Sequence, residues 1–276
     1  MTEDTPEAQS TSKPTKTAIT MVLDRSGSMD ACRDATIESV NAYLTKTRAD
    51  QNLKDSDFEL AIFDTEAYDV IRRGDLVATR DIARDEFEPR SGTPLLDAVG
   101  RGIDGLDRRA RDDNAILVVV TDGLENSSRK HTYESIKALL DERQKKGWLV
   151  LFLGAGLESA REGIRMGVQS ANVASIAVDQ ACLRASMDAM AEANAVYAAA
   201  PSVSARRMFV DNEKFSPETR AAMGDSTGGR GLLGASGSGL KKKFFNRKPS
   251  GATMPKAPPA READTWSGAN EDAWRK

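Results

Sequence analysis

Short apolar runs alternate with amphipathic segments through the first 200 residues of this chain. Runs rich in strand-forming residues indicate buried β-strands, whereas apolar residues spaced three and four positions apart indicate helices. The strand pattern occurs at residues 17–24, 58–63, 114–121, 148–153 and 173–178. Helical patterns occur at about residues 30–50, 94–110, 132–146, 158–166 and 179–200. This alternation predicts a Rossmann-like α/β fold, with a doubly wound, mostly parallel sheet and helices on both of its faces.

One further strand is expected at the edge of this sheet. Residues 68–72 follow the strand at 58–63 after a short turn that begins at Asp64 and Thr65. Two strands joined by so short a turn pair as an antiparallel hairpin. The next stretch, residues 74–89, is acidic and has no clear period, so we expect a long loop with one short helical turn.

Composition divides the chain into three parts. Residues 1–16 are rich in Thr, Ser, Glu and Pro, which predicts a disordered lead-in. From Pro201 onward the composition shifts to Gly, Ser, Pro and Lys, so residues 201–276 are expected to form a mostly disordered tail. The folded domain is therefore predicted to span residues 17–200, which is long enough to bury a core.

Charge is distributed unevenly between the domain and the tail. The whole chain has a net charge of −3. Residues 201–276 contain 14 Lys and Arg against 8 Asp and Glu, a surplus of +6, which leaves −9 for residues 1–200. An acidic domain does not predict specific nucleic-acid binding. The basic run at residues 241–248, around Phe244 and Phe245, suits either a solubilising tail or a short interaction segment.

Other features of the sequence bear on the cellular compartment. No apolar run approaches the ~18 residues that a membrane span requires, and the polar N-terminus lacks the apolar core of a secretory signal. With only two cysteines, Cys32 and Cys182, a disulfide framework is not expected. We therefore expect a cytoplasmic protein without a membrane span.

A carboxylate and two hydroxyls follow the first strand directly. Asp24 ends the apolar run, and Ser26 and Ser28 come next with Gly27 between them. Three oxygen-bearing side chains within five residues, with no His or Cys beside them, suit a hard divalent cation. The same spacing also fits a plain turn between a strand and a helix, in which the serines only cap the helix.

Two other segments bring further oxygen atoms to the same region. Thr93 precedes Pro94 at the start of a helix, and Asp122 follows the Val-rich strand at residues 114–121. In an open α/β sheet, ligands bind at the carboxyl ends of the strands near the switch in strand order. Two carboxylates and three hydroxyls would form an oxygen-only site with a charge of −2. Such a site suits Mg²⁺ or Mn²⁺ and leaves at least one coordination position open.

The run Asp24-Arg25-Ser26-Gly27-Ser28, then Thr93 within Ser91–Leu95, then Thr121-Asp122-Gly123 resembles the von Willebrand factor type A (VWA) domain. The resemblance covers about residues 17–200. It implies a metal-ion-dependent adhesion site in which Ser26, Ser28 and Thr93 contact the metal through hydroxyl oxygens. Asp24 and Asp122 would hold the metal directly or through water.

The resemblance also implies a type of partner. In such a site an Asp or Glu of a partner protein completes the coordination of the metal. The run Phe152–Gly156 is similar to the bacterial and phage intracellular branch of the family, whose members often accompany AAA+ ATPases or other multi-protein machines. The expected function is therefore metal-dependent binding of an acidic residue on such a partner. The loops 74–90 and 124–131 are candidates for the rim of the site, where Arg25 would either attract an acidic partner or be an ordinary exposed arginine.

Two other functions compete with this interpretation. A phosphatase that uses Asp24 as its nucleophile would need a carboxylic acid two residues later, where this chain has Ser26. The only histidine, His131, lies in a polar loop, and no glycine-rich phosphate loop is present. A metal-dependent hydrolase is thus less favoured, and no enzymatic activity is expected. The second competitor is a metal-free scaffold that binds its partner through the basic tail.

Overall fold

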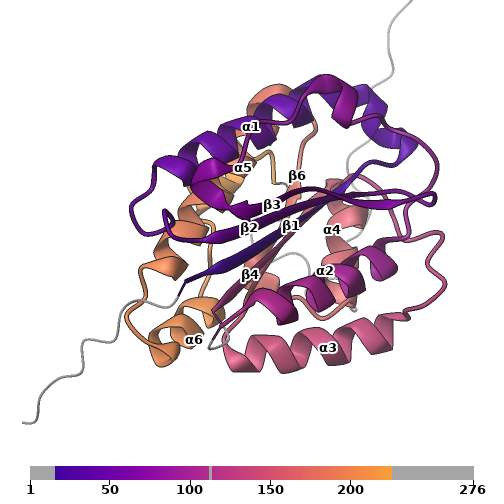
Figure 1. Cartoon of the computed structure of the whole chain (residues 1–276). Coiled ribbons are helices and arrows are strands. Elements are labelled where there is room, and N and C mark those ends of the chain that lie inside the picture. Colours follow the sequence, from indigo (N-terminus) through magenta and orange to yellow (C-terminus); the bar gives the residue numbers. More distant parts are fainter. Residues whose placement is uncertain (1–15, 112–113, 226–276) are drawn as a thin grey trace, which may run out of the picture. The chain divides into compact units, whose positions relative to one another are not determined.

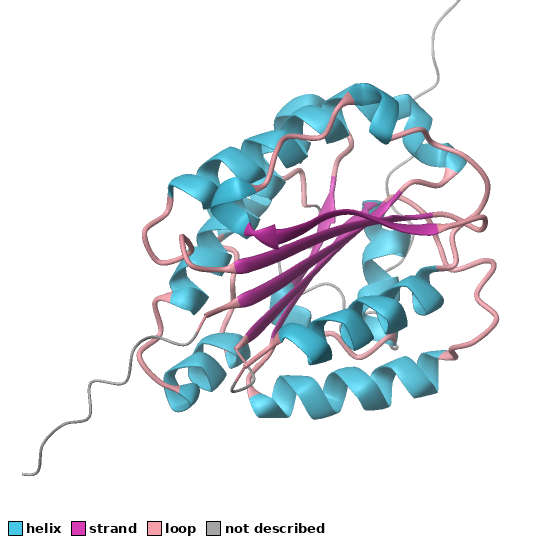
Figure 2. Cartoon of the chain, in the orientation of Figure 1, coloured by secondary structure: helices cyan, strands magenta, loops and turns pink. Residues whose placement is uncertain are grey.

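A six-stranded sheet forms the middle of the domain. The computed structural model describes residues 16–111 and 114–225, and every structural statement below concerns these residues. Within them the strands are β1 (Ala18–Asp24), β2 (Asp57–Phe63), β3 (Tyr68–Asp75), β4 (Ala115–Thr121), β5 (Leu149–Ala155) and β6 (Val173–Ile176). Figure 2 shows the strands between two layers of helices. The predicted α/β fold class is confirmed.

The order of the strands across the sheet is β3-β2-β1-β4-β5-β6. All neighbouring pairs are parallel except β2 and β3, which form the expected antiparallel hairpin at one edge. The chain passes from β1 to β2 on one side and later returns to β4 on the other side of β1. The switch in strand order therefore lies between β1 and β4, where ligands bind in folds of this kind.

Each face of the sheet is covered by its own set of helices. One face packs against α1 (Arg33–Ala49) and α5 (Gln180–Ala198), and the opposite face against α2 (Leu95–Arg109), α3 (Tyr133–Lys146) and α4 (Gly156–Arg165). Figure 1 shows α1 and α5 above the strands and α2 and α3 below them. Among the described residues, no helix is both long enough and apolar enough to cross a membrane.

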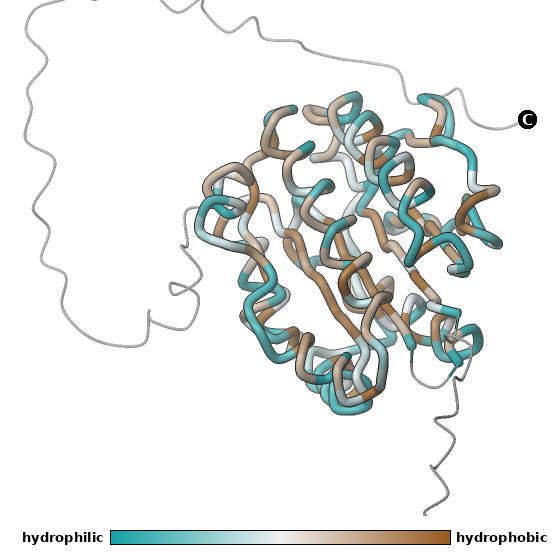
Figure 3. Tube along the Cα trace, turned by 90° about the vertical axis from the view of Figure 1, so that its left-hand side faces the viewer, coloured by the Kyte–Doolittle hydropathy of each residue, from teal (hydrophilic) through white to brown (hydrophobic). Residues whose placement is uncertain are grey.

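The apolar pattern of the central strands explains why they lie between two helical layers. Every residue of β1 and of β4 is buried. Their side chains point alternately to the two faces, so Met21 belongs to the core beneath α1 and α5, and Val22 to the core beneath α2. Figure 3 shows the strands as the most hydrophobic part of the trace, surrounded by hydrophilic turns.

The segment boundaries differ from the sequence expectations at several places. The helix expected from residue 30 begins with a 3-10 helix, η1 (Gly27–Cys32), before α1. Strand β3 extends to Asp75, and the expected single turn in the following loop is two short ones, η2 (Leu76–Ala78) and η3 (Arg84–Glu86). A further short turn, η4 (Ser170–Asn172), precedes β6.

The folded domain does not end at residue 200. Two more helices follow, α6 (Val203–Asp211) and α7 (Pro217–Ala222). Three apolar residues of this region, Val210, Phe215 and Met223, are buried in the core beneath α5. The expected boundary was wrong because the apolar positions of this region are few and form no periodic run, so the change in composition after Pro201 was interpreted as the end of the domain. Residues 1–15 and 226–276, which hold nearly all of the expected lead-in and the rest of the tail, lie outside the described residues.

Candidate metal centre

Asp24 is the last residue of β1 and its side chain is fully buried at the carboxyl edge of the sheet. One carboxylate oxygen accepts a hydrogen bond of 2.7 Å from the backbone N–H of Ser26. The other accepts one of 2.6 Å from the hydroxyl of Thr121, the last residue of the neighbouring strand β4. These two donors fix the orientation of the carboxylate. Thr121 is a residue that the sequence analysis quoted but gave no role.

The two serines of the loop connect Asp24 with Asp122. The hydroxyl oxygens of Ser26 and Ser28 are 3.1 Å apart, and Ser28 donates a hydrogen bond of 2.8 Å to Asp122. Ser26 occupies the N-cap position of η1, but its side chain makes no capping hydrogen bond. The alternative in which the serines only cap the next helix is therefore not what the structure shows. Both hydroxyls are directed at the carboxylates instead.

Thr93 joins this group from a third segment of the chain. An added Cβ on Gly123 would lie 2.7 Å from Thr93 Oγ1 and 3.4 Å from Asp24 Oδ2, so these two oxygens border the same point. Thr93 is buried. The helix after it begins one residue later than expected, with Pro94 at the N-cap and Leu95 as its first residue. All five predicted site residues are thus brought together.

The position of Thr93 is fixed by the loop that follows β4. The Asn126 side chain accepts a hydrogen bond of 2.8 Å from the Thr93 N–H, and the Asn126 N–H donates one of 3.2 Å to the Thr93 carbonyl. Glu125 accepts from the N–H of Leu96 at 2.9 Å. Sequence reasoning missed Asn126 and Glu125, because a polar loop offers no periodicity that indicates which side chains turn inward.

Burial governs the electrostatics of both carboxyl groups. Desolvation raises the pKa of Asp24 to about 6, against the lowering effect of the hydrogen bonds from Thr121 and Ser26. Desolvation also raises the pKa of Asp122, although its hydrogen bond from Ser28 acts in the opposite direction. Both carboxylates lose hydration on folding, and no basic side chain of the described residues is bonded to them, so they gain most from a neighbouring cation.

The donor set suits a hard dication. Two carboxylates and three hydroxyls supply only oxygen atoms, the ligand type that Mg²⁺ and Mn²⁺ prefer. Within the described ranges, no three His, Cys, Asp or Glu side chains come together as a metal-binding group. A cation at this place would therefore depend on hydroxyl ligands as much as on carboxylates, because three or more charged ligands of the described residues do not come together there.

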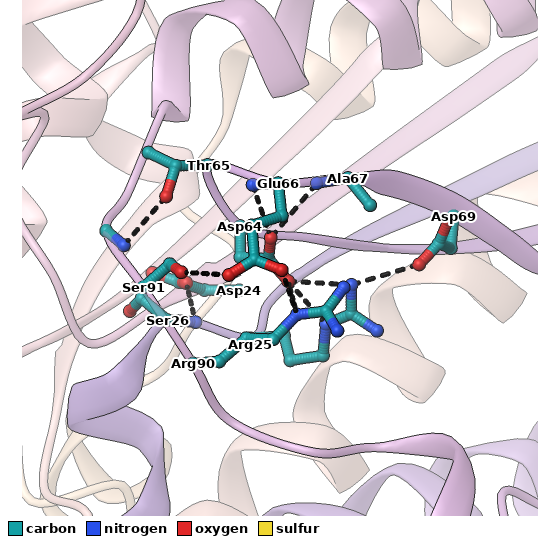
Figure 4. Close-up of polar contacts among 11 residues, drawn as sticks. Asp24, Arg25, Ser26, Asp64, Thr65, Glu66, Ala67, Asp69, Arg90 and Ser91 are labelled. Atoms are coloured by element: carbon teal, nitrogen blue, oxygen red, sulfur yellow. Dashed lines mark hydrogen bonds and ion pairs between the residues drawn. The ribbon is translucent and has the colours of Figure 1, made fainter. Parts of the chain in front are cut away.

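Arg25 has neither of the two roles considered from the sequence. Its side chain is buried and forms ion pairs with Asp64 at 2.7 Å and with Asp69 at 3.0 Å. Asp64 also pairs with Arg90 at 3.0 Å, and Figure 4 shows both guanidinium groups directed at its carboxylate. A backbone hydrogen bond also joins these two arginines, because the Arg90 N–H donates to the Arg25 carbonyl at 3.0 Å. This cluster connects the loop after β1, which carries Ser26 and Ser28, to the segment that leads to Thr93.

Two other features singled out in the sequence are parts of the framework. The ring of His131 lies against α2, where an added Cβ on Gly100 would meet its Nε2. Gly154 lies under α4, since an added Cβ there would be 2.3 Å from the backbone nitrogen of Ala160. His131 therefore packs between elements, and Gly154 allows the close approach of a helix to β5.

No protein-family profile matches this chain, and no curated protein sequence matches it either. Among solved structures it is similar to the pilus adhesin SpaC from Lactobacillus rhamnosus GG in its open conformation, with a TM-score of 0.52 and 15% identity. That match covers 66% of this chain but only 30% of the SpaC chain.

Two other similar structures are proximal thread matrix protein 1 from the mussel byssus and the SpRpn10 VWA domain. The mussel protein matches with a TM-score of 0.48 and 16% identity over 66% of this chain and 46% of that chain. The SpRpn10 domain matches with a TM-score of 0.46 and 14% identity over 63% of this chain and 95% of that chain.

At this level of identity the likeness shows the fold. The parallel sheet with its one antiparallel edge strand, the two helical layers and the similarity to SpaC define a Rossmann-like α/β protein. The chain has the fold of a von Willebrand factor type A domain.

Proposed function

We propose that this chain is a protein-binding module that recognises an acidic residue of its partner through a bound divalent cation. The observation that carries the proposal is the meeting of Asp24, Ser26 and Ser28 with Thr93 and Asp122 at the switch in strand order. Three segments distant in sequence bring only oxygen atoms to one place, and the serine side chains face the carboxylates without capping a helix.

In this proposal Ser26, Ser28 and Thr93 hold Mg²⁺ or Mn²⁺ through hydroxyl oxygens, and Asp24 and Asp122 hold it directly or through water. The cation would supply an electrophilic centre with an open coordination position for a carboxylate. The residues of the chain orient the ligands: Thr121 and the Ser26 N–H fix Asp24, and Asn126 fixes the backbone of Thr93. A dication held by two carboxylates would be close to neutral, so a partner carboxylate that coordinates the cation meets no net negative charge.

The surroundings of the site support binding rather than catalysis. Leu124 and Leu157 are exposed, and both follow strand ends at the edge where Asp122 lies. Exposed leucines beside a polar centre suit contact with another protein. We propose an AAA+ ATPase or another component of a multi-protein machine as the partner, and a cytoplasmic location in which the unpaired Cys32 and Cys182 stay reduced.

The proposal is tested by titrating Mg²⁺ into the full chain in a calorimeter. The wild-type protein is expected to bind the metal, whereas Asp24→Ala and Asp122→Ala abolish the heat of binding and retain the fold by circular dichroism. Asp188→Ala, which removes a carboxylate on α5, is the matched control and keeps wild-type affinity. Unchanged Mg²⁺ affinity in both site variants would reject the assignment. Capture of the partner from a host lysate, with and without EDTA, then tests metal dependence.

A further inference from the structure

A cavity of about 220 Å³ lies beside the candidate metal centre. Its walls come from three segments: the turn between β2 and β3, the first turns of α2, and the loop after β4. Pro94, which follows Thr93 directly in the chain, is one of the lining residues. The cavity is therefore next to one of the proposed metal ligands and at the same edge of the sheet.

The acidic residues of the cavity already have partners within the protein. Asp64 accepts hydrogen bonds from two arginines and from the N–H groups of Glu66 and Ala67. Asp97 accepts from three consecutive backbone N–H groups at 2.9–3.0 Å. These N–H donors, together with His131, lower the pKa of the Asp97 carboxyl although burial acts to raise it. Glu66 pairs with Ser91 and Arg90.

The basic residues of the cavity, by contrast, form no ion pairs with the described part of the chain. Arg101 and Arg129 both line it and are exposed, and neither has an ion pair with any carboxylate of the described residues. The guanidinium carbon of Arg101 lies 5.5 Å from the centre of the Tyr68 ring, which holds it on the wall of the cavity. Ser127, another lining residue, has a buried hydroxyl oxygen with no hydrogen-bond partner among the described residues. The groups of the cavity that remain available to a ligand are therefore two guanidinium groups and one hydroxyl.

We propose that this cavity binds a second carboxylate of the same partner segment. The inference rests on the proposed function, because it takes the first carboxylate to be the one at the metal. The partner sequence would then be a short acidic peptide with two Asp or Glu residues a few positions apart. Arg101 and Arg129 form charge-assisted hydrogen bonds to the second carboxylate, and they select against partners with a single acidic residue.

The test uses blocked synthetic peptides and the full, ¹⁵N-labelled chain in Mg²⁺ buffer. One peptide carries a single Asp among glycines. The others carry Asp and Glu, with an increasing number of glycines between them. Binding is followed by chemical-shift titration. We expect at least one spacing to bind about tenfold more tightly than the single-Asp peptide, as one added charge-assisted contact allows. Arg101→Gln and Arg129→Gln each remove most of that gain.

Arg184→Gln, on α5 and remote from the cavity, is the matched control and retains the gain. If single-Asp binding requires Mg²⁺ and Asp24 but no Asp–Glu peptide binds more tightly, the inference is overturned and the proposed function stands. A gain that persists in both arginine variants also overturns it. If no peptide shows Mg²⁺-dependent binding, the proposed function fails, and the second-carboxylate site fails with it.

Discussion

Gly123 controls how closely two of the candidate ligands approach each other. A methyl group at this position would lie 2.7 Å from Thr93 Oγ1, a distance at which the hydroxyl must move. We expect Gly123→Ala to weaken Mg²⁺ binding about tenfold and to lower the free energy of unfolding by about 1–2 kcal/mol, as overpacking does. Calorimetry and thermal unfolding measure the two effects.

Gly27 offers the control for this substitution within the same site. An added Cβ there would be 3.5 Å from the Ser91 carbonyl oxygen, an ordinary contact. Gly27→Ala is therefore expected to keep Mg²⁺ affinity within about twofold of wild type. Equal losses in both variants would show that any methyl group in these loops disturbs binding, and that the Thr93 hydroxyl has no special role.

For single residues, the sequence predicts which side chains are candidate metal ligands better than it predicts which side chains pair with each other. Asp24, Ser26 and Ser28 could be identified because an apolar strand ends at Asp24 and the two serines follow directly, so the strand's direction places all three at one edge. Arg25 could not be placed, since its burial depends on Asp64, 39 positions further along the chain. From the sequence alone, Asp64 is identifiable only as the start of a turn. Nothing in the local pattern indicates that these two residues meet.

The segment between β3 and α2 has little regular structure, and Arg72 is one of the residues that hold it in place. Arg72 of β3 is buried and donates hydrogen bonds to the backbone carbonyls of Arg80 and Asp81. It also forms a bidentate pair with Glu86 at 2.9 and 2.6 Å. Other contacts join the segment to α1, including two between Asn41 and Ile82. Most of the loop expected at the rim of the site therefore packs along α1.

Acid is expected to loosen this segment. The hydrogen bonds from Arg72 lower the pKa of Glu86 to about 2, against the opposing effect of desolvation. A carboxyl group whose folded pKa lies below its unfolded value of about 4.5 stabilises the fold above pH 4.5, and this stabilisation is lost as the pH falls through about 2. Glu86→Gln should remove that dependence and about 2 kcal/mol of stability, because Arg72 stays buried without its counter-charge.

Hydrogen exchange of the segment's amides, measured at several pH values, checks this expectation. Asp85→Asn is the control, because Asp85 is an exposed neighbour with no ion pair to a described residue. Exchange in Asp85→Asn should follow wild type, and exchange in Glu86→Gln should already be fast at neutral pH. Slow exchange in Glu86→Gln would mean that the contacts with α1 suffice to hold the segment.

On the scale of the whole molecule, the sequence predicts the sheet and its order of elements but not where the domain ends. The strands and major helices follow from periodic apolar patterns, which are local. The last two helices, α6 and α7, depend instead on a few apolar residues without a clear period, which complete the core beneath α5. Arg220 is an example: it is buried, pairs with Glu213 and Asp225, and donates a hydrogen bond to the carbonyl of Val173 in β6. Such a role depends on β6 and cannot be read from the local sequence.

Truncation tests the boundary and the function together. A chain that ends at residue 225 is expected to unfold at the same temperature as the full protein. A chain that ends at residue 200 loses Val210, Phe215 and Met223 from the core. At roughly 2 kcal/mol for each buried side chain, this removes about 6 kcal/mol, comparable to the whole stability of many domains. The shorter chain should therefore be largely unfolded by circular dichroism, and a melting curve like that of the full protein would contradict this.

The chain that ends at residue 225 also separates the candidate metal centre from the basic tail, because it keeps every described contact of that centre. If it still captures the partner and EDTA releases that partner, binding depends on the metal centre. If capture is lost with the tail and the full chain binds regardless of EDTA, the metal-free scaffold is the better description. A cut at residue 200 could not distinguish these outcomes, since loss of the core beneath α5 would abolish binding in either case.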